Sequence, residues 1–145
     1  MKDLKDGLSE VTELSDRHDP KLMKIYETSE WYSVKYIASL ALGIENELDV
    51  YIKGLEEDLN AETGCFMKDA DECKAVPYYT KRRKAVKDAA ELFKRTGSLA
   101  IRELLEKFYL TNSDEIARTE TGKALGHCSA RIRVDNLIFR LLNGR

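Results

Sequence analysis

The segment from Trp31 to Ile44 restricts the possible folds of this chain more than any other stretch. Apart from its tyrosines, its polar residues are limited to Ser33, Lys35 and Ser39. A helix at the surface needs one apolar stripe, whereas a helix that is apolar on every side has to be surrounded by other elements. We therefore expect this segment to form the centre of a helical bundle, covered by neighbouring helices and by another copy of the chain.

The apolar pattern extends this central helix in both directions. Asp19 and Pro20 form a helix start signal, because aspartate caps a helix and proline fits its first position. Downstream, apolar residues recur at intervals of three and four as far as Leu59, which is typical of a coiled-coil seam. The pattern predicts one helix over residues 20–60, about 60 Å long at about 1.5 Å per residue. Gly43 lies within it and is interpreted as a point where a neighbouring helix comes close.

The rest of the chain also has the periodicity of helices, and no segment shows the alternation of a strand. Residues 61–76 form a long polar interruption and are predicted to be a crossover loop. Gly97 is compatible with either a break between two helices or a bend in one. The predicted fold is a single all-α domain over residues 1–145, an up-and-down bundle of about five long helices. Besides the central helix, helical patterns cover residues 3–15, 77–95, 99–110 and 113–142, the last capped by Ser113.

The composition of this 145-residue chain fits one globular domain, with 43% hydrophobic residues, 34% charged residues and a formal net charge of −2. So small a net charge gives no overall field that would favour nucleic acid or a membrane surface. The N-terminus carries acidic residues throughout and lacks an apolar run, so no targeting segment is predicted. No stretch approaches the roughly 20 apolar residues of a membrane-spanning helix. We expect a cytoplasmic protein without membrane contact.

The cysteines Cys65, Cys73 and Cys128 are odd in number and lack Cys-x-x-Cys spacing. This usage is typical of reduced thiols, although a Cys65–Cys73 bridge within one loop is an alternative.

Metal-binding patterns are incomplete. A dinuclear centre in a helical bundle needs Glu-x-x-His motifs, but a serine and an alanine lie three residues before His18 and His127. The acidic run from Asp69 to Glu72 resembles the start of a calcium loop, yet it lacks the turn glycine, and Thr80 occupies the position of the final glutamate. We predict no metal and no cofactor, and interpret the acidic run as a solvated loop.

A run of cations opens the helix predicted over residues 77–95 and directly follows a pair of tyrosines. Because the helix dipole disfavours positive charge at this end, bound phosphate would offset the cost, and the aromatic rings could stack on a base. The alternative is a solvated face, or ion pairs with the acidic outer face of the central helix of another subunit. The run consists of Lys81, Arg82, Arg83 and Lys84, after Tyr78 and Tyr79.

Polar residues also form two rows on the otherwise apolar C-terminal helix. His127, Arg131 and Asp135 are spaced at i, i+4 and i+8, and this spacing suits an ion pair between Arg131 and Asp135. The second row, at i, i+3 and i+7, consists of Arg133, Asn136 and Arg140.

These rows have two interpretations. One is a buried polar layer between subunits that fixes their register, since an unpaired charge in a core is costly. The other is a ligand cleft in which the arginines hold phosphates and His127 carries a proton.

The segment from Arg131 to Phe139, RIRVDNLIF, resembles the C-terminal arginine- and asparagine-rich helix of the ATP-dependent cobalamin adenosyltransferases. The layout also resembles small archaeal proteins grouped with that helical-bundle fold. The resemblance implies a bundle that assembles, typically as a trimer, and it points to Arg133 and Asn136 as the ligand-contacting residues. The Thr-Gly-Asp-Gly-type nucleotide loop of those enzymes has no counterpart at this N-terminus, and Tyr79 to Lys81 only echoes its start. The resemblance therefore implies the fold and assembly, not the activity.

The sequence supports three hypotheses on function. The first is a non-catalytic homo-oligomer of helical bundles. The second is a nucleotide-binding enzyme related to the adenosyltransferases, with Arg131, Arg133 and Asn136 on the phosphates. The third is a nucleic-acid-binding module that uses residues 81–84.

Overall fold

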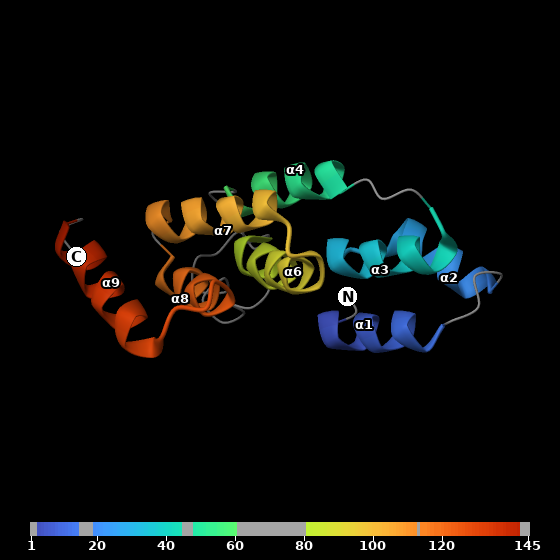
Figure 1. Ribbon diagram of the computed structural model, residues 1–145, viewed down its shortest axis with the longest axis horizontal. Coiled ribbons are helices and arrows are strands. Elements are labelled where there is room, and N and C mark those ends of the chain that lie inside the picture. Colours follow the sequence, from blue (N-terminus) through green and yellow to red (C-terminus); the bar gives the residue numbers. More distant parts are fainter. Residues whose placement is uncertain (1–2, 15–18, 45–47, 61–80, 113, 143–145) are drawn as a thin grey trace, which may run out of the picture. The chain divides into compact units, whose positions relative to one another are not determined.

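The computed structural model describes residues 3–14, 19–44, 48–60, 81–112 and 114–142 (Figure 1). These residues contain eight helices and no strand, which confirms the predicted all-α class but not the bundle of about five long helices. The chain divides into two compact units, unit 1 over Met1–Glu57 and unit 2 over Asp58–Arg145. The single domain over residues 1–145 remains a prediction, and the two units are described separately.

Unit 1 is organised around helix α3 (Tyr32–Leu42). Helices α1 (Leu4–Glu13) and α2 (Pro20–Thr28) both pack against it (Figure 1). The N-terminal helix is confirmed, as is the start signal before α2, because the Asp19 side chain accepts a hydrogen bond from the Lys21 N–H at 2.9 Å. The buried cluster of this unit consists of Val11, Leu22, Trp31, Val34 and Ala38.

The predicted helix over residues 20–60 is wrong, because this region forms α2, α3 and α4 (Leu48–Leu59), the last crossing the boundary between the units. Ser29 ends α2, and its Oγ accepts a hydrogen bond from the Trp31 N–H at 3.2 Å. At the end of α3, Gly43 adopts a φ of 72°, its N–H donates to the Leu40 carbonyl, and the next N–H donates to the Ser39 carbonyl. This Schellman motif needs a left-handed residue, which glycine supplies without steric cost. Gly43 is therefore a helix terminator rather than a packing site.

The apolar segment over residues 31–44 lies in the middle of this region, and its buried residues are covered by the same chain. Trp31, Val34 and Ala38 are buried in the cluster formed with α1 and α2. Leu40 is 55% exposed, so the segment is not enclosed on every side within the chain.

Unit 2 contains α6 (Lys81–Thr96), α7 (Leu99–Thr111), α8 (Glu115–Ala124) and α9 (Ser129–Leu142). Helix α6 packs against α7 and α8, and α8 also packs against α7 and α9 (Figure 1). Gly97 has a φ of 63° and separates α6 from α7, which resolves the alternative that the sequence leaves open. The start of the predicted 77–95 helix, the 61–76 loop with its cysteines and acidic run, and His18 lie outside the described residues.

The predicted helix over residues 113–142 is also two helices. Gly126 has a φ of 86°, its N–H donates to the Lys123 carbonyl, and the His127 N–H donates to the Gly122 carbonyl. This is a second Schellman motif, and it turns the chain into α9. The cap of α8 is Asp114 rather than the predicted Ser113, because the Asp114 side chain accepts hydrogen bonds from the N–H groups at the start of the helix.

Candidate functional site

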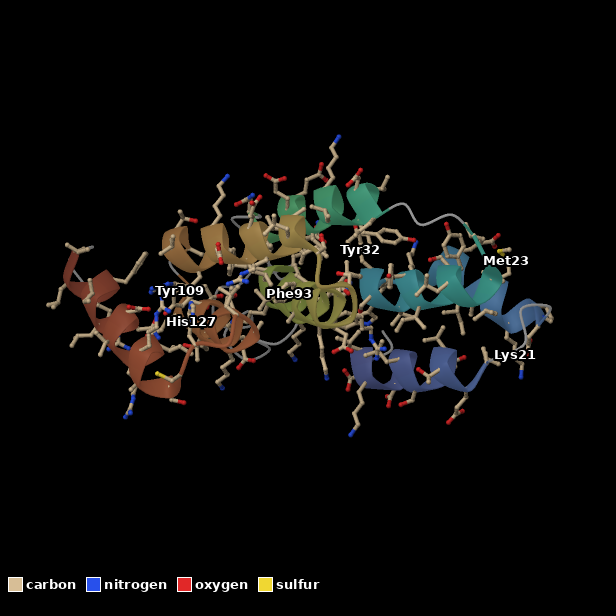
Figure 2. The ribbon with its side chains drawn as sticks, viewed as in Figure 1. Lys21, Met23, Tyr32, Phe93, Tyr109 and His127 are labelled. Atoms are coloured by element: carbon tan, nitrogen blue, oxygen red, sulfur yellow. The ribbon has the colours of Figure 1, made fainter. Side chains whose placement is uncertain are left out.

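A polar cluster joins α9 to the preceding two helices, and Tyr109 of α7 lies at its centre (Figure 2). The Tyr109 hydroxyl donates to Asp135 Oδ2 at 2.5 Å. Burial, together with this hydrogen bond to a carboxylate, raises the pKa of Tyr109 to about 12. The hydroxyl is therefore a protonated donor at neutral pH, which is the form that the carboxylate of Asp135 requires.

Arg118 of α8 forms the inner side of this cluster. Its side chain is buried, and Nε donates to the Tyr109 carbonyl oxygen at 3.0 Å. The guanidinium lies 4.0 Å from the ring centroid of Phe139 and 5.5 Å from that of Tyr109. Burial lowers the pKa of Arg118, and the ring faces stabilise the cation that desolvation disfavours. One arginine thus contacts residues of both α7 and α9.

His127, Arg131 and Asp135, the first polar row predicted on the C-terminal helix, are brought together at the outer side of the cluster. Arg131 Nε lies 3.6 Å from Asp135 Oδ2, and its Nη1 lies 3.2 Å from His127 Nδ1. The imidazole also packs against the Tyr109 ring in a T-shaped arrangement, with the ring centroids 5.1 Å apart (Figure 2). Side chains at the predicted spacing therefore do contact one another along α9. Tyr109, which the sequence did not point to, connects them to the interior of the unit.

The second predicted row does not converge. Asn136 is buried and its Nδ2 donates to Thr119 Oγ1 on α8 at 3.1 Å. Arg140 forms an ion pair with Glu115 at the start of α8. Arg133 is exposed. These three side chains therefore point to different surroundings and do not form one phosphate cradle.

The basic run opens α6, where Arg83 has a structural role. Its Nε lies 3.2 Å from Asp114 Oδ2, and its Nη2 lies 3.4 Å from Oδ1 of the same carboxylate. Because Asp114 also caps α8, this ion pair connects the starts of two helices. The neighbours Lys81, Arg82 and Lys84 have interaction partners as well.

Sequence reasoning missed Tyr109, Arg118 and Thr119. Arg118 shares the buried face of α8 with small residues, Ala117, Thr121 and Gly122. A cation on a helix face of small residues is a signal of close packing around a buried charge, and it could have drawn attention to this position.

The outer side of α9 carries a continuous apolar stripe. Its residues are spaced at i, i+3, i+4, i+7 and i+8. Because each residue of a helix is rotated by about 100° from the one before it, they lie on the side of α9 opposite the buried residues Ile132 and Asn136. Each is between 48% and 80% exposed. This outer stripe consists of Val134, Leu137, Ile138, Leu141 and Leu142.

In the described ranges, no group of three histidine, cysteine or acidic side chains is placed so that it could hold a metal ion. The helices of that same part of the chain are all too short or too polar to cross a bilayer. Comparison of the chain with protein-family models, curated proteins and solved structures finds no match in any of the three. The resemblance to the adenosyltransferases remains a prediction.

Proposed function

We propose that the chain is a non-catalytic helical protein that associates with copies of itself through the outer stripe of α9. The observation that supports this proposal is the continuity of the stripe from Val134 to Leu142, the end of α9. Single exposed apolar residues are common, whereas a contiguous apolar surface is typical of an interaction site. Burial of such a surface contributes about 25 cal/mol for each Å² removed from water.

The spacing of the stripe fits a helix as its partner. Val134, Leu137 and Leu141 are separated by three and then four residues, the interval of a coiled-coil seam. Two copies of α9 related by a twofold axis would place this seam against itself, which is the commonest geometry of a homodimer.

Charge is compatible with a second copy as the partner. Arg131, Arg133 and Arg140 flank the stripe. Arg131 and Arg140 already contact Asp135 and Glu115 of their own unit, so two paired helices bring little uncompensated positive charge together.

The polar cluster supports the same function, because it fixes the helix that carries the stripe. Tyr109 and Arg118 hold α9 against α7 and α8 through groups whose partners belong to the same unit. A rigidly held helix loses less conformational freedom on association than a free one does.

The experiment is a measurement of molar mass by light scattering after gel filtration. The wild-type chain is expected to form a dimer or a larger oligomer, and the double variant Leu137→Glu/Leu141→Glu a monomer with an unchanged circular dichroism spectrum. Leu99→Glu is the matched control, because Leu99 is 67% exposed on α7 and is not part of the stripe. A wild-type chain that stays monomeric from about 10 μM to about 1 mM would refute the proposal.

Nucleotide and nucleic-acid binding have less support. Arg83, Arg131 and Arg140 already contact carboxylates of their own unit. A phosphate would have to compete with those carboxylates for the same guanidinium groups.

A further inference from the structure

The connection between α8 and α9 is short and consists of residues 125–128. Leu125 keeps right-handed helical backbone geometry, and the Cys128 carbonyl already accepts a hydrogen bond from the Ile132 N–H of α9. The sequence of residues 113–142 contains no proline and by itself predicts one continuous helix. The break between the two helices is therefore confined to Gly126 and His127.

Gly126 takes its left-handed conformation from the local turn and not from the packing of its neighbours. Its φ is 86°, and a Cβ atom at this position would have no described neighbour within 4 Å. Glycine adopts this conformation without steric cost, and it is also tolerated inside a helix. The backbone at Gly126 is therefore compatible with the observed turn and with a helical conformation, in which α8 and α9 form a single helix.

The contacts that dock α9 do not depend on its covalent joint to α8. Asp135 accepts the hydrogen bond of the Tyr109 hydroxyl on α7, and Asn136 Nδ2 donates to Thr119 Oγ1 on α8 at 3.1 Å. The buried residues of α9 are Ile132 and Asn136, whereas its outer stripe is in contact with solvent. Release of α9 from its own unit therefore exposes little additional apolar surface.

We infer that α9 is an arm that two copies of the chain exchange. In the exchanged form α8 and α9 are one helix, and α9 of each copy docks on α7 and α8 of the other. The contacts of Tyr109, Arg118 and Thr119 with α9 are kept, but they now join two chains. Exchange of an identical element is a low-cost route to a dimer for this reason, and a short connection favours it. A straightened α8–α9 helix cannot fold back onto its own unit, so the partner that covers α7 and α8 is a second copy.

The exchange goes beyond the self-association proposed above, because it does not use the outer stripe. The stripe lies on the opposite side of α9 and stays exposed in both forms. The exchange is therefore tested in the full chain that carries Leu137→Glu/Leu141→Glu, in which the contact through the stripe is removed.

In that background, Gly126→Ala is expected to favour the exchanged dimer. Alanine is the better residue in a continuous helix and is disfavoured in the left-handed conformation, so both effects act in the same direction. Light scattering over a series of concentrations should give a dissociation constant of the dimer about a hundredfold lower than with Gly126, about tenfold for each of the two joints. Insertion of Gly-Ser-Gly after Gly126 is the control. The longer connection lets α9 fold back onto its own unit, so this variant should be a monomer.

Cross-linking establishes which helices meet in the dimer. Glu115 of α8 and Arg140 of α9 form a partly exposed ion pair, so cysteines at these positions are within reach of a short bismaleimide. The natural cysteines are replaced by serine, and chains with Glu115→Cys are mixed with chains with Arg140→Cys. In the Gly126→Ala dimer we expect a cross-link between the two chains, identified by peptide mapping as a 115–140 bond. The chain with both cysteines and Gly126 is the reference, because its closed form makes this bond within one chain.

Two results would overturn the inference. One is a folded Gly126→Ala chain, judged by circular dichroism, that remains a monomer up to about 1 mM. The other is a dimer in which the 115–140 bond forms only within one chain. Deletion of His127 shortens the connection and is expected to give the same exchanged dimer, so the result does not depend on one substitution. A wild-type chain that fails to associate through the outer stripe would leave these results unchanged, since the stripe contact is absent from both tests.

Discussion

Helices α3 and α9 are both rich in apolar residues, but they differ in how far other helices cover them. α3 is covered by α1 and α2, which leaves Trp31, Val34 and Ala38 almost without solvent exposure. α9 packs mainly against α8, with Ile132 buried and the outer stripe in contact with solvent. The apolar content of a helix therefore does not determine how much of it is buried. The number of neighbours that the chain places around the helix determines it.

The two helices are also held by different forces. The buried cluster around α3 consists of large apolar side chains, and the buried polar residues of this helix are two small serines, Ser33 and Ser39. In α9, the buried residues are Ile132 and Asn136, and polar contacts to the preceding helices come from Asn136 and from Asp135 and Arg140 beside it. Hydrogen bonds are directional, so they fix the orientation of a helix whose apolar contact with its own unit is small. This orientation keeps the stripe facing outward.

The largest expected effect tests the polar attachment of α9. Replacing Arg118 with alanine leaves the buried Tyr109 carbonyl without its donor and opens space beside Phe139. We expect the local unfolding free energy of α8 and α9 to fall by about 3–5 kcal/mol, the summed cost of an unsatisfied buried carbonyl and of the cavity, measured by native-state amide hydrogen exchange.

Arg102→Ala is the control, because Arg102 pairs with Glu106 on the exposed surface of α7 at 3.0 Å. Its loss should cost no more than about 0.5 kcal/mol. If the two variants behaved alike, the buried arginine would not anchor α9.

A matched pair of valines tests the difference in burial. Val34 of α3 is 1% exposed and Val134 of α9 is 54% exposed. Val34→Ala should lower the free energy of unfolding by about 2–3 kcal/mol, since methyl groups leave a packed cluster. Val134→Ala should change it by less than about 0.5 kcal/mol at a concentration where the chain is monomeric. Urea denaturation measures both, and equal effects would contradict the contrast between the helices.

The smallest effect tests Tyr109 through pH. Its folded-state pKa of about 12 lies above the ordinary value of 10, so the folded state holds the proton more tightly than the unfolded state. The contribution of protonated Tyr109 to the free energy of unfolding is fully present below pH 10 and is lost as the pH rises toward 12. At neutral pH, Tyr109→Phe should cost about 1–2 kcal/mol, because Asp135 loses its donor.

The difference in stability between wild type and Tyr109→Phe, followed by urea denaturation, should narrow above pH 10. A difference that stays constant up to pH 12 would mean that the tyrosine does not titrate as described.

Parts of the fold and of the site were predictable because their causes are local. The start of α2 follows from Asp19 and Pro20, and the periodicity near Leu4 gives α1. The contact between Arg131 and Asp135 follows from their spacing on one helix. The partnership of Asp135 with Tyr109 was not predictable, since these residues are 26 positions apart and meet only when α7 and α9 come together.

The glycines show which features the sequence determined and which features only the tertiary structure decided. The sequence alone determined that the chain is helical, where several of its helices begin, and which faces are apolar. It did not determine that Gly43 and Gly126 end helices while Gly7 and Gly122 continue them. A glycine allows both outcomes because it has no Cβ. The tertiary structure decides between the two outcomes. A Cβ at Gly122 would lie 2.9 Å from Ile132 Cγ1, so the packing of α8 against α9 requires glycine there. At Gly43 and Gly126 the chain needs a residue with left-handed backbone geometry in order to turn toward its next contact.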